Sequence, residues 1–237
     1  MQIDILTLFP EVFAGAFGSS IIKRSQDKKI VTINLHNLRH WAVDTRGTVD
    51  DRPYGGGAGM VLMVEPIFKA LSEIKKPKTG AKSKTILLSP QGKTFSQRKA
   101  QSLSKLQQLI LICGHYEGVD ERVRQYLVDE EVSIGDYVLS GGEIPAMVVV
   151  DTISRLLPGV LTKEEATQFE SFQPLAVGKK TIAEALEYPH YTRPEVFRGW
   201  KVPDILLSGH HQKISHWRAE TAFAKTKKSR PDLLHNS

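Results

Sequence analysis

The sequence predicts an α/β domain with a mostly parallel sheet, followed by a small C-terminal helical domain. Short apolar runs typical of strands alternate with segments of helical periodicity through residues 1–160. Such alternation is typical of parallel sheets that are covered by helices. Glycine-rich loops follow two of the later runs, which is where open α/β sheets bind their ligands.

Each element is expected from its own pattern. Apolar runs predict strands over residues 3–9, 30–35, 84–89, 109–113 and 131–134. Helical periodicity predicts helices over residues 66–74, 96–106, 120–127 and 144–157. Thr94 or Ser96 is expected to cap the second of these helices and Asp120 the third, because each offers an oxygen to unpaired backbone N–H groups.

The pattern weakens after residue 160. Residues 161–174 are polar and without periodicity, which predicts an interdomain linker. Residues 175–237 are interpreted as a helical domain, with a helix over 209–225 that turns Ile214 and Trp217 inward. Trp200 is expected in the same small core. A domain of this size has little core of its own and is expected to lean on a neighbour.

Charge points to a polyanionic partner. The chain carries a net charge of +6. Between residues 193 and 230 nine basic residues stand against three acids, so this segment alone carries the whole surplus. Since lysine and arginine neutralise phosphates and supply most sequence-independent binding energy, the C-terminal domain is predicted to bind nucleic acid.

The sequence lacks the features of disulfide-bonded, multi-cysteine metal-binding and membrane proteins. A single cysteine, Cys113, excludes an internal disulfide and a multi-cysteine metal site, and its apolar run predicts buried packing. No run of 18 apolar residues and no basic-then-apolar leader is found, so we expect a cytoplasmic protein without a membrane partner.

The two glycine-rich loops have the sequences CGHYEGVDER (113–122) and SIGDYVLSGGE (133–143). Glycine clusters where a backbone approaches closely or adopts unusual dihedral angles, although ordinary tight turns would also explain them. Neither a P-loop nor a dinucleotide-binding Gly-x-Gly-x-x-Gly follows a strand here. The loops therefore favour a ligand with a nucleoside and little phosphate charge.

Seven ordered motifs carry a resemblance to a known family. They are DILTLFP (4–10), DRPYGGGAGM (51–60), LSPQG (88–92), the two loops above, YPHYTRPEV (188–196) and LLSGHH (206–211). With this spacing the chain closely resembles, over nearly its whole length, the bacterial TrmD-type tRNA (guanosine-37 N1)-methyltransferases of the SPOUT class. The resemblance implies a deep trefoil knot in the first domain and a homodimer. It also implies S-adenosyl-L-methionine as methyl donor and the tRNA anticodon stem-loop as substrate.

The resemblance also implies a set of cofactor-binding residues from three loops. They are Leu88, Ser89, Pro90 and Gly92; Gly114, Tyr116, Glu117 and Gly118; and Ile134, Gly135, Tyr137, Leu139, Gly141, Gly142 and Pro145. Glycine backbones can read the adenine edge while tyrosine and leucine cover its faces. Glu117 is a candidate for the methionyl ammonium or for Mg²⁺, the additional cofactor that the resemblance allows. Relatives often have arginine where His115 stands.

Two residues are implied for the chemistry. Removing the N1 proton of guanine calls for a base, and charge growing on O6 calls for a cation. By resemblance these roles fall to Glu170 and Arg155. The chain departs from the family here, because most relatives have aspartate at the position of Glu170. The side chain is one methylene longer, and catalysis is sensitive to misplacement of about 1 Å.

The remaining implied contacts are with RNA. Asp51, Arg52 and Tyr54 resemble residues that shape a guanine pocket, and Arg193, Lys213 and Arg218 are candidates for phosphate contacts. Three other classes stay open as alternatives: a knotted ribose 2′-O-methyltransferase, an RNA-binding module without catalysis, and a nucleotide hydrolase. The basic C-terminal domain argues against the ribose methyltransferase, and the coordinated glycine loops argue against a module without catalysis. The absence of a phosphate-binding lysine motif argues against the hydrolase.

Overall fold

The structure is a computed structural model that describes residues 1–75, 82–162, 167, 169–178 and 180–234. It divides the chain into two compact units, Met1–Thr162 and Lys163–Ser237. Each unit is described by itself. Part of the segment expected as a linker, residues 163–166 and 168, lies outside the described residues. Within the described part of the chain, no helix combines the length and apolar character needed to cross a membrane.

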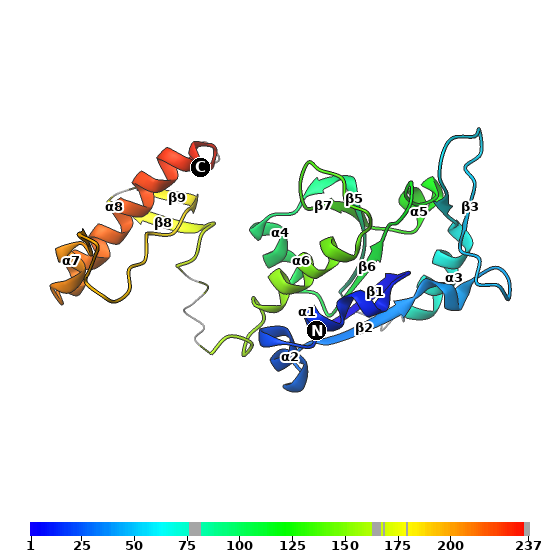
Figure 1. Cartoon of the computed structure of the whole chain (residues 1–237), viewed down its shortest axis with the longest axis horizontal. Helices are drawn as coiled ribbons and strands as arrows, with labels where there is room; N and C mark the ends of the chain where they lie inside the picture. Colours follow the sequence, from blue (N-terminus) through cyan, green and yellow to red (C-terminus); the bar gives the residue numbers. More distant parts are fainter. Residues whose placement is uncertain (76–81, 163–166, 168, 179, 235–237) are drawn as a thin grey trace. The chain divides into compact units, whose positions relative to one another are not determined.

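A parallel sheet of five strands forms the centre of the first unit (Figure 1). The strands are β1 (Gln2–Thr7), β2 (Thr32–Asn37), β5 (Ser83–Thr94), β6 (Gln108–Cys113) and β7 (Glu130–Ser133). Their order across the sheet is β2-β1-β6-β5-β7, and every neighbouring pair is parallel. The five predicted strands and the mostly parallel sheet are thus confirmed, with shifted boundaries.

Alternate side chains of the strands enter two separate cores. Ile3, Ile5 and Leu111 pack on one face with Val149 of α6 (Glu143–Ser154). Leu6 and Ile112 pack on the other face with Ile67 of α3 (Val64–Ile74). Because successive side chains of a strand point to opposite faces, a nearly continuous apolar strand requires helices on both sides. Figure 1 shows α6 and α3 on opposite sides of the sheet.

Two helices of the first unit begin at predicted caps. Ser96 precedes α4 (Gln97–Leu103), and its hydroxyl accepts a hydrogen bond from Lys99 N at 3.2 Å. Asp120 precedes α5 (Glu121–Tyr126) and accepts from Arg122 N at 2.9 Å. The elements not predicted are short: η1 (Pro10–Phe13), α1 (Ala14–Phe17), α2 (Ser20–Asp27), η2 (Leu38–Trp41), β3 (Asp50–Asp51) and β4 (Val61–Leu62). Apart from α2, which has eight residues, these are single turns or strands of two residues, too short to show a period.

A buried carboxylate joins three strands of the sheet. Asp4 is 1% exposed, and its oxygens accept hydrogen bonds from Asn34 (2.8 Å), His36 (3.0 Å), Gln2 (2.8 Å) and Gln108 (2.8 Å). Burial raises the pKa of the Asp4 carboxyl, but these hydrogen bonds outweigh burial and hold the pKa below its usual value. The cluster stabilises the sheet only while Asp4 is ionised.

The second unit is not purely helical, which corrects the sequence prediction. It contains the hairpin β8 (Gln173–Val177) and β9 (Lys180–Ala185), a second ribbon of β10 (Val196–Phe197) and β11 (Trp200–Lys201), and the helices α7 (Asp204–Leu207), α8 (His211–Ser229) and η4 (Pro231–Leu234). The strand β8 begins inside the segment that was expected to be linker. Along β8, half-buried residues alternate with exposed ones and none is fully buried. Its sequence therefore shows no clear alternation of apolar and polar residues.

The core of the second unit is small and lies where α8 packs against β8, β9 and η4. Ile182, Ala185, Ala222 and Leu233 are buried there. Thr226 of α8 is buried too, and its hydroxyl accepts from Leu186 N at 2.9 Å. Ile214 and Trp217 are half-buried. The prediction for Trp200 is wrong, because this side chain is 72% exposed on a ribbon that does not pack into the α8 core.

Candidate active site

A cavity of about 290 Å³ lies at the carboxyl ends of β5, β6 and β7. Every predicted cofactor-binding residue except Gly92 lines it: Leu88, Ser89, Pro90, Gly114, Tyr116, Glu117, Gly118, Ile134, Gly135, Tyr137, Leu139, Gly141, Gly142 and Pro145. Parallel strands end at the same edge of a sheet, so loops far apart in the sequence meet there. The three loops predicted from sequence therefore form one cavity.

The first wall is an excursion within β5. The pairing of β5 with β7 shifts register between Leu88 and Lys93, and the residues between them, Ser89 to Gln91, turn into the cavity. Gly92 has a packing role instead. A Cβ on Gly92 would lie 2.4 Å from Val132 N and 2.5 Å from Glu131 C, so only glycine lets β5 return this closely to β7.

The second wall follows β6. Cys113 ends the strand fully buried, as predicted, and burial together with the charge of Glu143 raises the pKa of its thiol well above the usual value. A buried thiol with a raised pKa is a poor nucleophile. The next residues turn sharply: Tyr116 has φ 57° and Gly118 has φ 122°. Tyr116 lines the cavity from this turn.

The third wall runs from Ile134 to Gly142. Ser133 Oγ accepts from Gly135 N at 3.1 Å and donates to Gly135 O at 2.9 Å. Gly135 has φ 153°, and a Cβ there would lie 2.4 Å from Cε1 of Tyr137. At the far end Gly142 N donates to Gly114 O at 2.8 Å, which joins the third wall to the second. Gly135 is therefore favoured by its backbone angle, as in a tight turn, and the third wall is fixed to the second at Gly142.

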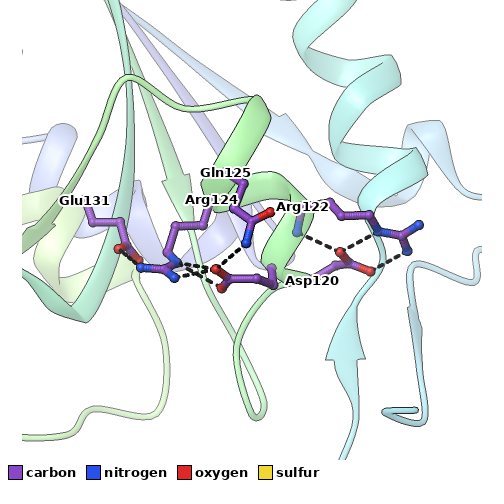
Figure 2. Close-up of polar contacts among 6 residues, drawn as sticks. Asp120, Arg122, Arg124, Gln125 and Glu131 are labelled. Carbon is purple, nitrogen blue, oxygen red and sulfur yellow. Dashed lines mark hydrogen bonds and ion pairs between the residues drawn. The ribbon is translucent and has the colours of Figure 1, made fainter.

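Charged residues that the sequence analysis did not single out also line the cavity. Glu121, Arg124 and Glu131 line the cavity, as Glu117 does. Arg124 Nε donates to Glu121 Oε1 and Oε2 at 3.0 and 2.9 Å, and Arg124 Nη1 reaches Glu131 Oε2 at 3.5 Å (Figure 2). Hydrogen bonds from Arg124 hold the pKa of the Glu121 carboxyl below its usual value. Three carboxylates against one guanidinium leave this wall negative.

A buried polar cluster lies behind the third wall. Glu143 is 7% exposed, and its Oε1 accepts from Thr7 Oγ1 at 2.7 Å. A Cβ on Gly141 would lie 2.4 Å from Glu143 Oε2 and 2.6 Å from His115 Nδ1. These close approaches to one glycine explain why position 141 has no side chain. They also seat His115, which lines the cavity, next to the start of α6.

The loop with the predicted guanine-binding residues adjoins the second wall. Glu117 N donates to Met60 O at 3.1 Å, and Leu62 N donates to Gly118 O at 3.0 Å. The Glu117 side chain also lies against Gly59, where a Cβ would approach its Cγ to 2.6 Å. Asp51, Arg52 and Tyr54 precede this contact and are exposed. Two loops that were predicted to serve different ligands are therefore neighbours.

The two predicted catalytic residues do not line the cavity, taken over the residues that the structure describes. Arg155 is half-buried at the end of α6 in the first unit. Glu170 is half-buried in the second unit. The segment after Glu170 is anchored, because Phe172 N donates to Ala185 O at 2.6 Å and Ser171 Oγ accepts from Glu187 N at 3.2 Å.

The predicted phosphate-binding residues all belong to the second unit. Arg193, Lys213 and Arg218 are exposed. Lys213 and Arg218 lie on α8, and the Arg218 guanidinium stacks on Tyr188 with its Cζ 4.6 Å from the ring centroid. This contact holds the Arg218 side chain in place.

The cavity fits S-adenosyl-L-methionine better than it fits a metal ion. Its carboxylates suit the cationic sulfonium and ammonium groups, and its tyrosines and leucines suit the adenine faces. A fully protein-held Mg²⁺ needs several oxygen ligands. Among the described residues no three His, Cys, Asp or Glu side chains gather as such a set, so we derive no step through Mg²⁺.

Comparison with known proteins decides the family. The sequence profile described as tRNA (Guanine-1)-methyltransferase TrmD matches residues 1–236. The chain belongs to this family. A relative from Carboxydothermus hydrogenoformans is 55% identical over 234 residues, which cover 99% of this chain and 87% of the relative. One from Halalkalibacterium halodurans is 53% identical over 234 residues, covering 99% and 91%. Both relatives are named tRNA (guanine-N(1)-)-methyltransferase.

Proposed function

We propose that this chain transfers a methyl group from S-adenosyl-L-methionine to N1 of guanosine 37 in tRNA, next to the anticodon, in the cytoplasm. The observation that carries the proposal is the cavity in which the three glycine-rich loops meet, in a chain of the TrmD family. A cavity of about 290 Å³ with a negative wall suits a small cationic nucleoside.

The cofactor is assigned to the cavity because the residues of the cavity walls suit its different parts. The glycine backbones of the second and third walls serve the adenine edge, and Tyr116, Tyr137 and Leu139 cover its faces. Glu117 receives the methionyl ammonium. Bound in this way, the cofactor supplies an electrophilic methyl group on a sulfonium.

The target base is assigned to the loop beside the second wall. Asp51, Arg52 and Tyr54 would hold the guanine, and the backbone bonds from Glu117 and Gly118 to Met60 and Leu62 keep this loop against the cofactor wall. A base in a stem-loop reaches such a pocket by leaving its stack. The neighbouring loops therefore support an arrangement in which methyl donor and acceptor lie side by side.

The chemistry needs one base and one cation. Glu170 would take the N1 proton of guanine while N1 forms its bond to the methyl carbon and the C–S bond breaks, its electron pair staying on sulfur. Arg155 would stabilise the negative charge that grows on O6. Anchoring of Ser171 and Phe172 to the end of β9 supports a fixed position for Glu170 within its unit.

We further propose a trefoil knot in the first unit and a homodimer. The backbone bond between Gly142 and Gly114 brings the segment after β7 against the end of β6, a close approach that a threaded chain would need. The dimer is supported by α6, on which Ile144 (53%) and Val148 (39%) are exposed one turn apart. Exposed apolar side chains grouped in this way are typical of an interaction surface.

Sedimentation tests the dimer with a matched pair of variants. Val148→Glu should shift the protein towards monomer, because it places a charge in the proposed interface. Phe68→Glu introduces the same charge at an exposed apolar residue of α3, on the other face of the sheet, and should leave the dimer unchanged. Equal behaviour of the two variants would count against α6 as the interface.

Methyl transfer from labelled S-adenosyl-L-methionine tests the function itself. The substrate is a tRNA transcript with guanosine at position 37, and the control transcript carries adenosine there. We expect N1-methylguanosine from the first and no product from the second. Transfer to both transcripts, or to a ribose, would contradict the assignment of base and position.

A further inference from the structure

An exposed aromatic ribbon in the second unit has no role in the function proposed so far. The strands β10 (Val196–Phe197) and β11 (Trp200–Lys201) are antiparallel, and Phe197 pairs with Trp200. Phe197 is 53% exposed and Trp200 is 72% exposed. Every residue from His190 to Lys201 is exposed. A two-stranded ribbon with two large rings open to water is expected to bind a partner.

The geometry of the ribbon holds its side chains together. The rings of Phe197 and Trp200 have centroids 5.9 Å apart at an interplanar angle of 57°. Arg198 Cζ lies 5.6 Å from the Phe197 centroid. Arg198 and Gly199 form the turn with φ 52° and 83°, the positive values that tight hairpin turns require. Gly199 has open space around it, so its backbone angle alone explains the glycine.

A left-handed conformation at Arg198 is uncommon for a residue with a side chain. The Arg198 guanidinium lies over the Phe197 ring, so Phe197, Arg198 and Trp200 form one exposed cluster of two tilted rings and a planar cation. Nucleobases stack on aromatic rings and on guanidinium planes alike. This surface therefore has the chemistry of a base-stacking platform.

Charge decides which class of partner the ribbon fits. Tryptophan and arginine are also enriched in protein–protein interfaces, whereas lysine is depleted there. From His190 to Lys201 the segment carries Arg193, Arg198 and Lys201 against a single acid, Glu195. Aromatic rings between cations suit a single strand of nucleic acid, whose bases stack while its phosphates pair.

We propose that the β10–β11 ribbon binds an unpaired nucleotide of the RNA substrate. Its base stacks on Trp200, the more exposed ring, with the tilted Phe197 ring at its edge, and the adjacent phosphates lie against Arg198 and Lys201. The proposal rests on the proposed function only in taking tRNA as that RNA. The ribbon contributes to RNA affinity and carries no part of the methyl transfer, so its loss raises KM for tRNA and leaves kcat unchanged.

A binding experiment on the full-length protein separates stacking from charge. Trp200→Ala should weaken binding of an anticodon stem-loop about 10-fold, because stacking on an aromatic ring contributes on this scale. Trp200→Phe keeps a ring and should recover most of the affinity. Val196→Ala, which removes exposed apolar surface from the same ribbon, is the matched control and should bind within about 2-fold of the wild type. Wild-type affinity in Trp200→Ala would overturn the proposal.

Fluorescence identifies the occupant directly. Adding the stem-loop should quench tryptophan emission in the wild type by a component that Trp200→Phe lacks, and a blunt duplex should not. Absence of that component overturns the proposal. So does a change of the Trp200 component with protein concentration alone, which would assign the ribbon to a second copy of the chain.

Methyl transfer distinguishes failure of this inference from failure of the proposed function. If the wild type methylates guanosine 37 and Trp200→Ala has the same KM, only the ribbon proposal is wrong. If the wild type does not methylate the transcript but shows the Trp200-dependent quenching with RNA, the ribbon proposal stands and the proposed function fails.

Discussion

Replacing Gly142 with alanine tests whether the cavity depends on close contact between the end of β6 and the start of α6. A Cβ at this position would lie 2.5 Å from Cys113 Cα, 2.9 Å from Gly114 N and 3.0 Å from Cys113 Cβ. Gly142 has φ −82°, which alanine adopts without strain. The effect of the substitution therefore comes from the contacts alone.

The magnitude follows from these distances. Carbon atoms in contact are ordinarily about 3.5–4.0 Å apart, so the start of α6 must move away from β6 by about 1 Å. Overpacking of this kind destabilises by about 1–3 kcal/mol. Gly142 also lines the cavity and donates to Gly114 O, and a displacement of about 1 Å lowers turnover by about 100-fold.

Urea unfolding measures the loss of stability, and transfer of a labelled methyl group measures the loss of turnover. Calorimetric titration with S-adenosyl-L-methionine shows whether the displaced wall also weakens cofactor binding. The matched control is Gly114→Ala, which also lines the cavity but would meet only Leu88 O, at an ordinary 3.5 Å. We expect it to change the free energy of unfolding by less than about 0.5 kcal/mol. If Gly142→Ala and Gly114→Ala unfold alike and bind the cofactor alike, close packing at Gly142 does not shape the cavity.

Three further predictions concern catalysis, RNA binding and stability. Glu170→Gln should bind the cofactor normally and lose about 100-fold or more in turnover, while Glu170→Asp keeps most of it; wild-type turnover in the glutamine variant would exclude Glu170 as the base. Lys213→Glu should weaken tRNA binding and reduce its salt slope by about 1, so an unchanged slope argues against a phosphate contact. Asp4→Asn should lower the free energy of unfolding at pH 7 by about 3 kcal/mol, because it removes charge-assisted hydrogen bonds. Because the folded pKa of Asp4 is lowered, its contribution is present above about pH 4 and disappears as the pH falls through the folded value. In urea titrations the two proteins should therefore converge towards acid pH, and a constant difference would show that ionisation of Asp4 is not the cause.

The central sheet was predictable because its strands are local patterns. The run from Gln108 to Cys113 is apolar at every position after the first, and only a strand covered on both faces buries such a run. Ser96 and Asp120 marked the starts of α4 and α5 because capping depends on neighbouring backbone groups. Fold class, helix starts and the positions of the glycine loops were therefore encoded over short stretches of sequence.

The C-terminal unit was less predictable because its elements are short and half-exposed. The strands β8 and β9 bury only part of their residues, and the ribbon of β10 and β11 buries none. Trp200 was expected in a core because large rings are usually buried. It is instead exposed on a two-residue strand beside the turn at Arg198 and Gly199, a strand too short for the sequence to reveal.

By itself, the sequence determined the parallel α/β class, the loops that meet in the cavity and, through its motifs, the TrmD family. Only the tertiary structure decided that Arg124 and Glu131 join these loops, that Gly92 packs between strands instead of lining the cavity, and that Trp200 faces water. The physical reason is the distance along the chain over which each interaction acts. Propensity, capping and periodicity act between residues a few positions apart, whereas a cavity wall or an exposed ring depends on which distant segments the sheet and its crossings bring together.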